Sequence, residues 1–184
     1  MACYVDRSVN IINGYTAGVT RDVRISFDLD DTLICYGDDG NGISCEPRLP
    51  LIVRLFVRDE PLRTGTRQLV NELQARGHEV WVYTSSGRTA RWIRWWLRLH
   101  GVRVHGVVDD ARHAACFGEG SLPTKRPHAF GIHMHVDNSP GVAIEGEQYG
   151  FNVCVVEPSA DDWVQQVLTA VEERERVAAA RPAV

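Results

Sequence analysis

Five short runs of β-branched and apolar residues are spaced along this chain, and each ends near polar or acidic residues. Runs of this length and composition are typical of buried β-strands. Between them lie segments whose apolar residues recur at helical spacing. Strands that alternate with helices favour a parallel sheet covered by helices. The predicted strands are Val23–Phe27, Glu79–Tyr83, Val102–Val108, Ile132–Val136 and Asn152–Val156.

The helical segments have recognisable ends. Thr64–Arg76 is followed by Gly77, and Arg88–His100 is followed by Gly101, and glycine in this position commonly stops a helix. Two further helices are predicted at Ser139–Tyr149 and at 159–177. The patterning as a whole predicts an α/β, Rossmann-like fold: a parallel sheet of about five strands flanked by helices.

With 184 residues, the chain is long enough for one domain with a substantial core. We predict that this domain spans residues 23–177, after a weakly patterned segment at 1–22 and before a frayed tail at 178–184. Two segments do not follow the alternation of strands and helices. Residues 34–61 are predicted to form a loop followed by a β-hairpin or flap, and residues 109–124 a long loop.

The overall composition excludes some classes of protein. No stretch approaches the roughly eighteen apolar residues of a membrane span, and the first residues lack the pattern of a secretory signal, which favours a cytoplasmic protein. The formal net charge of −4 argues against a generally basic nucleic-acid binder, but a local basic patch remains compatible with it. The five scattered cysteines contain no CxxC pair and are expected to be reduced thiols.

The strongest chemical signal is the sequence FDLDDTLI, which follows the first predicted strand. It places two carboxylates, Asp28 and Asp30, at the carboxyl end of that strand. In open α/β sheets ligands bind outside these ends. Asp oxygens are hard ligands that suit Mg²⁺, which commonly uses one or two protein carboxylates together with a substrate phosphate. The sequence therefore predicts a magnesium and phosphate site at this edge.

FDLDDTL resembles the first motif of the haloacid dehalogenase superfamily, a DxDxT sequence that follows a hydrophobic strand; Asp28, Asp30 and Thr32 match it. The resemblance implies that Asp28 attacks phosphorus to give an aspartyl-phosphate. It also implies that Asp30 protonates the leaving group and then activates water. Neither residues 34–61 nor residues 86–124 have room for a large inserted domain, so a capless or minimally capped member of the superfamily is expected.

Two later segments resemble further motifs of the same superfamily. EVWVYTSSG ends in hydroxyl residues, and Thr84 occupies the position that hydrogen-bonds the transferring phosphoryl group; helix capping by Ser85 or Ser86 is the alternative interpretation. IHMHVDNSPG resembles the motif that completes the metal site, and its turn is similar to that of the small carboxy-terminal-domain phosphatases. Either Asp137 or Asn138 is then a ligand of the metal beside Asp28 and Asp30.

The superfamily also needs a cation that steadies the phosphoaspartate. Lys125 in the sequence PTKRP is the predicted residue, Arg126 is the alternative, and an exposed basic turn is the non-functional interpretation. The histidines near this region, His133 and His135 among them, are expected to be structural because their spacing is not that of a zinc site.

One helix stands apart from these motifs. RTARWIRWWLRLHG combines three tryptophans with Arg88, Arg91, Arg94 and Arg98. The plain interpretation is an amphipathic helix with its arginines in solvent; nucleic-acid binding and a homodimer face are the alternatives.

Taken together, the residues and the resemblance predict a Mg²⁺-dependent phosphatase that hydrolyses a phosphate monoester through an aspartyl-phosphate. Its phosphorylated substrate is either a small molecule or a macromolecule. A phosphotransferase of the same superfamily and a non-catalytic phosphate- or nucleic-acid-binding module remain as alternatives.

Overall fold

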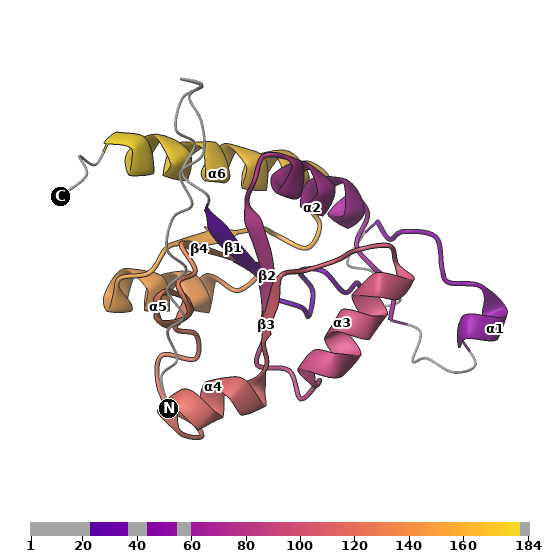
Figure 1. Ribbon diagram of the computed structural model, residues 1–184, viewed down its shortest axis with the longest axis horizontal. Coiled ribbons are helices and arrows are strands. Elements are labelled where there is room, and N and C mark those ends of the chain that lie inside the picture. Colours follow the sequence, from indigo (N-terminus) through magenta and orange to yellow (C-terminus); the bar gives the residue numbers. More distant parts are fainter. Residues whose placement is uncertain (1–22, 37–43, 55–59, 181–184) are drawn as a thin grey trace, which may run out of the picture.

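The computed structural model describes residues 23–36, 44–54 and 60–180 (Figure 1). Within these ranges the chain forms a five-stranded sheet in which every pair of neighbouring strands is parallel. The strands are β1 (Arg24–Phe27), β2 (Glu79–Tyr83), β3 (Gly106–Val108), β4 (Met134–Asp137) and β5 (Val153–Val155). The predicted α/β, Rossmann-like architecture is confirmed.

The order of the strands is β3-β2-β1-β4-β5, so the chain builds the sheet outward from β1 in one direction and then in the other. Phe27 of β1 is in register with Val82 of β2 and with Val136 of β4, which aligns the carboxyl ends of the three central strands. The direction of winding changes between β1 and β4. That change creates the crevice in which doubly wound sheets bind their ligands.

Helices cover the sheet on both faces (Figure 1). Two of them end at the predicted glycines, Gly77 and Gly101, which have positive φ angles of 91° and 75°. The helices are α1 (Leu51–Arg54), α2 (Thr66–Ala75), α3 (Ala90–Leu99), α4 (Asp110–Phe117), the 3-10 helix η2 (Pro127–Phe130), α5 (Pro140–Tyr149) and α6 (Trp163–Ala180).

The side chains of each strand point alternately to the two faces of the sheet, and this divides the hydrophobic core into two clusters. Val82 and Val107 belong to a large cluster that also contains apolar residues of α2, α3 and α6. Their neighbours Tyr83 and Val108 belong to a second cluster with Phe130 and partly buried residues of α4. Successive side chains of a strand point to opposite faces, so the two clusters are the two sides of one sheet.

The less regular segments depart from the expectations in three places. Residues 110–117 form α4 instead of a continuous loop, because the carboxylate of Asp109 caps the helix by accepting a hydrogen bond from the backbone of Arg112 at 3.0 Å.

The helix α6 continues to Ala180, so the predicted tail begins within it. Residues 181–184 and 1–22 lie outside the described residues.

A loop followed by a β-hairpin or flap was predicted for residues 34–61, and the described part of this segment contains no hairpin. Its apolar stretch begins as the short helix α1, and residues 37–43 and 55–59 lie outside the described residues. The segment is joined to the domain by isolated antiparallel bridges between Ile34 and Leu62 and between Cys45 and Arg63. In the described ranges, no helix has the length and apolar character needed to cross a bilayer.

Candidate active site

Two carboxylates and one ammonium group meet at the crevice between β1 and β4. Asp28 follows β1, and Asp137 is the last residue of β4. The Nζ atom of Lys125 donates to Oδ1 of Asp28 at 2.7 Å and to Oδ2 of Asp137 at 3.3 Å. The Lys125 side chain is only 3% exposed. The structure therefore brings together three residues that the sequence singled out separately.

A tight turn after β1 arranges the DxDxT residues. The backbone amides of Leu33 and Ile34 both donate to the carbonyl oxygen of Leu29, and Asp31 adopts a positive φ of 54°. Aspartate tolerates this conformation better than most residues. The turn directs Thr32 toward the loop after β4, where its hydroxyl donates to the amide oxygen of Asn138 at 3.3 Å.

Asp30 lies in a different charge network. Its carboxylate accepts hydrogen bonds from the guanidinium of Arg88, at 2.8 and 3.2 Å, and from the hydroxyl of Tyr36. Arg88 also pairs with Glu60 at 2.8 Å. Among the described residues, the His, Cys, Asp and Glu side chains close enough to share a metal ion do not include Asp30. The predicted grouping of its carboxylate with the metal ligands is not found.

His135 was expected to be structural, and the structure places its ring against the carboxylate of Asp137. Its ring is fully buried, with Nδ1 2.8 Å from the hydroxyl of Ser26 and Nε2 3.0 Å from Oδ2 of Asp137. Ligand atoms of Asp28, His135 and Asp137 all lie within 4.8 Å of one another. The sequence contained a signal for this contact: His135 and Asp137 are two residues apart on one strand, so their side chains lie on the same face of the sheet.

Burial and paired charges set the protonation states of the cluster. Burial raises the pKa of Asp28, and the nearby charge of Asp137 adds to this effect, whereas Lys125 opposes it. Burial alone lowers the pKa of Lys125, but the two carboxylates outweigh burial and raise it. Burial lowers the pKa of His135, which favours the neutral ring. The site thus holds a charged lysine against carboxylates that have little contact with water.

Hydroxyl groups lie at the end of the neighbouring strand. Thr84 follows β2 and is buried, and its Oγ1 accepts a hydrogen bond from the backbone of Ser86 at 3.1 Å. Thr89, and not Ser85 or Ser86, caps α3, so the predicted alternative of capping by those serines is wrong. The hydroxyl of Ser86 is buried without a hydrogen-bond partner among the described residues. Such a group is uncommon in folded proteins and is available to a polar ligand.

The loop before η2 decides between the two basic candidates. Thr124 is fixed to Glu145 of α5 by its backbone amide at 3.0 Å and by its hydroxyl at 2.7 Å. Lys125 then points into the carboxylate pair, whereas the guanidinium of Arg126 lies over the ring of Phe117, 4.7 Å from its centroid. The geometry favours Lys125 over Arg126 as the cation of the site.

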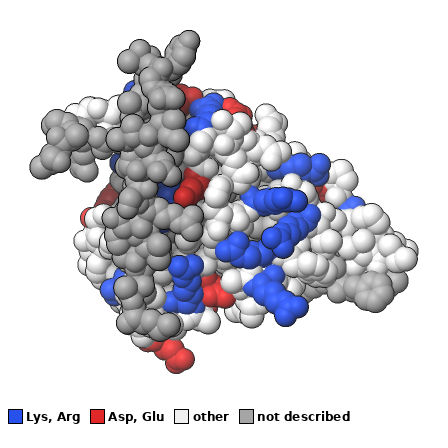
Figure 2. All heavy atoms as spheres, viewed as in Figure 1, with Lys and Arg blue, Asp and Glu red and all other residues white. Residues whose placement is uncertain are grey.

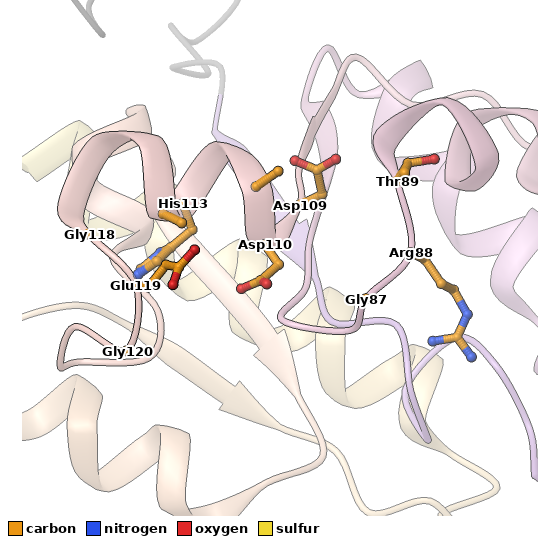
Figure 3. Close-up of a pocket in the computed structure, with 11 residues that line it drawn as sticks. Gly87, Arg88, Thr89, Asp109, Asp110, His113, Gly118, Glu119 and Gly120 are labelled. Atoms are coloured by element: carbon orange, nitrogen blue, oxygen red, sulfur yellow. The ribbon is translucent and has the colours of Figure 1, made fainter.

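A pocket of about 460 Å³ lies between the loop that precedes α3 and the helix α4 (Figure 3). It is lined by Gly87, Arg88, Thr89, Asp109, Asp110, Ala111, His113, Ala114, Gly118, Glu119 and Gly120. Figure 3 shows the guanidinium of Arg88 pointing away from the acidic residues on the opposite wall. The pocket does not contain the carboxylate pair, and it adjoins the site through Arg88, which binds Asp30.

The donor groups at the crevice fit a hard divalent cation. Asp28, His135 and Asp137 offer ligand atoms close enough to share a metal ion, and the two carboxylates are oxygen ligands of the kind that suits Mg²⁺. Oδ2 of Asp28 accepts no hydrogen bond from the described residues, which leaves it open to a ligand. His135 contacts Asp137 and would orient that carboxylate, as residues behind metal ligands commonly do.

No family model matches this chain, and a search of curated proteins likewise finds no significant match.

Proposed function

We propose that this protein is a Mg²⁺-dependent phosphatase of the haloacid dehalogenase type. One observation carries the proposal: Lys125 joins Asp28 and Asp137 at the point where the sheet changes its winding direction. A nucleophilic carboxylate, a second carboxylate and a buried cation are the groups that phosphoryl transfer through an aspartyl-phosphate requires.

Each residue has a distinct role in this proposal. An oxygen of Asp28 attacks phosphorus, the bond from phosphorus to the ester oxygen breaks, and the leaving alcohol takes a proton from Asp30. Water then attacks the aspartyl-phosphate, gives its proton to Asp30 and releases inorganic phosphate, which regenerates Asp28. Lys125 offsets the negative charge that develops on the transferring group.

Asp30 must exchange partners in order to act. Its carboxylate is bound to Arg88 and Tyr36, and its side chain is 36% exposed. A side chain with this access to solvent can rotate without disturbing the core. Substrate binding would therefore break the ion pair with Arg88, Asp30 would take up a proton from water, and the protonated carboxyl would donate a hydrogen bond to the leaving-group oxygen.

The metal would be held by Asp28, Asp137 and Asn138. Bound Mg²⁺ would reduce the repulsion between the phosphate dianion and the attacking carboxylate. In this proposal, Thr84 and the hydroxyl of Ser86 donate hydrogen bonds to phosphate oxygens; both residues follow β2, the neighbour of β1 in the sheet.

Hydrolysis of 4-nitrophenyl phosphate, measured with and without Mg²⁺, tests the proposal. Asp28→Asn should reduce kcat by about 10⁴-fold or more, because an amide is not a competent nucleophile. The matched control is Asp161→Asn, which removes an exposed carboxylate and should leave kcat unchanged. A folded Asp28→Asn protein with a near-wild-type rate would refute the assignment, and a wild-type protein without turnover would favour the binding-module alternative.

Metal binding can be measured without turnover. Mg²⁺ at about ten times its Kd should raise the Tm of the wild-type protein by about 3–5 °C, because it binds only the folded site. Asp137→Asn should reduce this shift, whereas Asp161→Asn should not. An equal shift in all three proteins would place the metal elsewhere.

A further inference from the structure

An open groove of about 730 Å³ runs along α3, outside the candidate active site. It is lined by Thr89, Ala90, Arg91, Trp92, Arg94, Trp95 and Arg98. The described residues that line the groove include three arginines and no acidic residue. Figure 2 shows Lys and Arg side chains gathered over the part of the surface where α3 lies. Positive charge is thus concentrated here on a chain whose formal net charge is −4.

The three tryptophans of α3 differ in their roles, and two of them, Trp92 and Trp95, line the groove. Trp96 is buried, and its indole donates to the carbonyl oxygen of Glu60 at 2.9 Å. Trp92 stacks on Trp96 with ring centroids 5.8 Å apart and an interplanar angle of 8°. Trp95 is 42% exposed and does not belong to either core cluster. An exposed indole between guanidinium groups is a surface on which a nucleobase can stack.

The groove adjoins the pocket of Figure 3 at the amino-terminal end of α3, because Thr89 lines both of them. The preceding residue, Arg88, binds Asp30 at 2.8 Å. A strand that followed α3 toward its amino-terminal end would therefore bring its terminus to the edge of the sheet at which Asp28 lies.

We propose that the α3 groove binds a single strand of nucleic acid and presents the terminal phosphate of that strand to Asp28. The proposal rests on the phosphatase function proposed above and names its substrate class. The arginines bind backbone phosphates, and Trp95 stacks on a base. Arg91 and Arg98 are seven residues apart, about 10 Å along the helix axis. At this separation the two guanidinium groups can contact different phosphates of one strand.

Fluorescence anisotropy with a labelled oligothymidylate of about twelve nucleotides tests the binding step. The double variant Arg91→Gln/Arg98→Gln should weaken binding at least tenfold, and Trp95→Ala should weaken it about fivefold or more. The control is Arg174→Gln/Arg176→Gln, which makes the same change in net charge on α6 and should leave the affinity unchanged.

Three results would overturn the proposal. They are an absence of oligonucleotide binding by the wild-type protein, an equal loss of affinity in the α6 control, and arginine-dependent binding to phosphatidylserine vesicles without binding to the oligonucleotide. The last result would identify the groove as a membrane contact.

Turnover separates a failure of this inference from a failure of the proposed function. Arg91→Gln/Arg98→Gln should lower kcat/KM for a terminally phosphorylated oligonucleotide at least tenfold and leave kcat/KM for 4-nitrophenyl phosphate unchanged. Asp28→Asn should abolish turnover of both substrates and still bind the oligonucleotide. If the wild-type protein hydrolyses the small ester and the groove variant has an unchanged kcat/KM for the oligonucleotide, the groove proposal fails while the phosphatase proposal stands.

Discussion

The carboxylate cluster and the α3 groove use charge in opposite ways. In the cluster, Lys125 is buried between Asp28 and Asp137, so opposite charges lie close together with little water between them. In the groove, the charged residues of the described lining are all arginines, so charges of like sign lie along a solvent-facing surface beside the exposed Trp95. Paired charges in a buried site interact strongly, and salt screens them little. Salt screens the interaction between exposed charges once they are more than a Debye length apart.

This difference indicates different tasks. The cluster is fixed by ion pairs and hydrogen bonds, as a site that stabilises developing charge must be. The groove leaves its charge available to a partner, as a surface that binds a polyanion must do. Perturbing the two regions should therefore give effects of different kind and size.

Beyond the nucleophile itself, the largest effect is expected from Lys125→Met. Removing the ammonium takes away the charge that stabilises the transferring phosphoryl group, so kcat for 4-nitrophenyl phosphate should fall about 10³-fold. Two buried carboxylates would also lose their cation, so unfolding by urea should show a loss of about 3 kcal/mol or more. Arg126→Met is the control, since the Arg126 guanidinium lies over Phe117 and not in the cluster.

If Arg126→Met were the inactive variant and Lys125→Met the active one, the assignment of the cation would be reversed. The double variant Asp28→Asn/Lys125→Met keeps the stability argument testable when the single variant unfolds. It removes one charge of each sign and should be more stable than Lys125→Met alone.

A smaller effect is expected from His135→Asn. The ring of His135 contacts Oδ2 of Asp137 at 3.0 Å and would orient a ligand of the metal without touching substrate. Loss of such a contact typically weakens metal binding by about 10–100-fold. The apparent Kd for Mg²⁺, measured from the Tm shift and from the activation curve, should rise in both assays. His133→Asn is the comparison, because the Nδ1 atom of His133 accepts from the backbone of Arg24 at the other end of the sheet. A similar rise in both variants would mean that His135 has no specific role in the site.

Salt should separate the two regions directly. If three arginines neutralise three phosphates of a single strand, the slope of log affinity against log salt should be about −2, which gives a roughly twentyfold loss between about 50 and 200 mM salt. The Arg91→Gln/Arg98→Gln variant should have a slope that is shallower by about 1.4. Hydrolysis of the small ester should change by less than about twofold over the same range, because its site is buried. Equal salt dependence of both measurements would remove the distinction between the regions.

The smallest effect is expected in a comparison of Arg88 with Arg91, which lie close together in the sequence. Arg88→Gln should lower the free energy of unfolding by about 1–3 kcal/mol, because the buried carboxylate of Glu60 loses its ion pair with Arg88. Arg91→Gln changes an exposed residue and should stay within about 0.5 kcal/mol of the wild type. Urea unfolding measures both, and an equal cost would show that Arg88 is as weakly coupled to the fold as a surface arginine.

Local patterns predicted most of the secondary structure. The β2 strand begins and ends as predicted, and Gly77 and Gly101 follow helices as expected, because their positions depend on neighbouring residues. The predicted strand at residues 102–108 was too long. Val102 donates its amide to the carbonyl of Leu97 in the turn after α3, so only Gly106–Val108 pairs with β2. Helix α4 was missed because its capping residue, Asp109, lies in a segment without clear apolar spacing.

The candidate site was predicted in part. Asp28, Asp137 and Lys125 were named from their motifs, and the structure brings them together. The pairing of Asp30 with Arg88 was not foreseen, and Arg88 was expected to face solvent with the other arginines of its helix. His135 was assigned a structural role because no zinc spacing was present.

The sequence by itself determined which segments form strands and helices and which residue types end the strands, because burial periodicity, capping and turn chemistry act over a few residues. Only the tertiary structure decided which of these ends are neighbours. Lys125 meets Asp28 across 97 residues of chain, and Arg88 meets Asp30 across 58. Such meetings depend on the order of the strands and on the charges that must be paired once water is removed. They are therefore properties of the folded sheet and of no single motif.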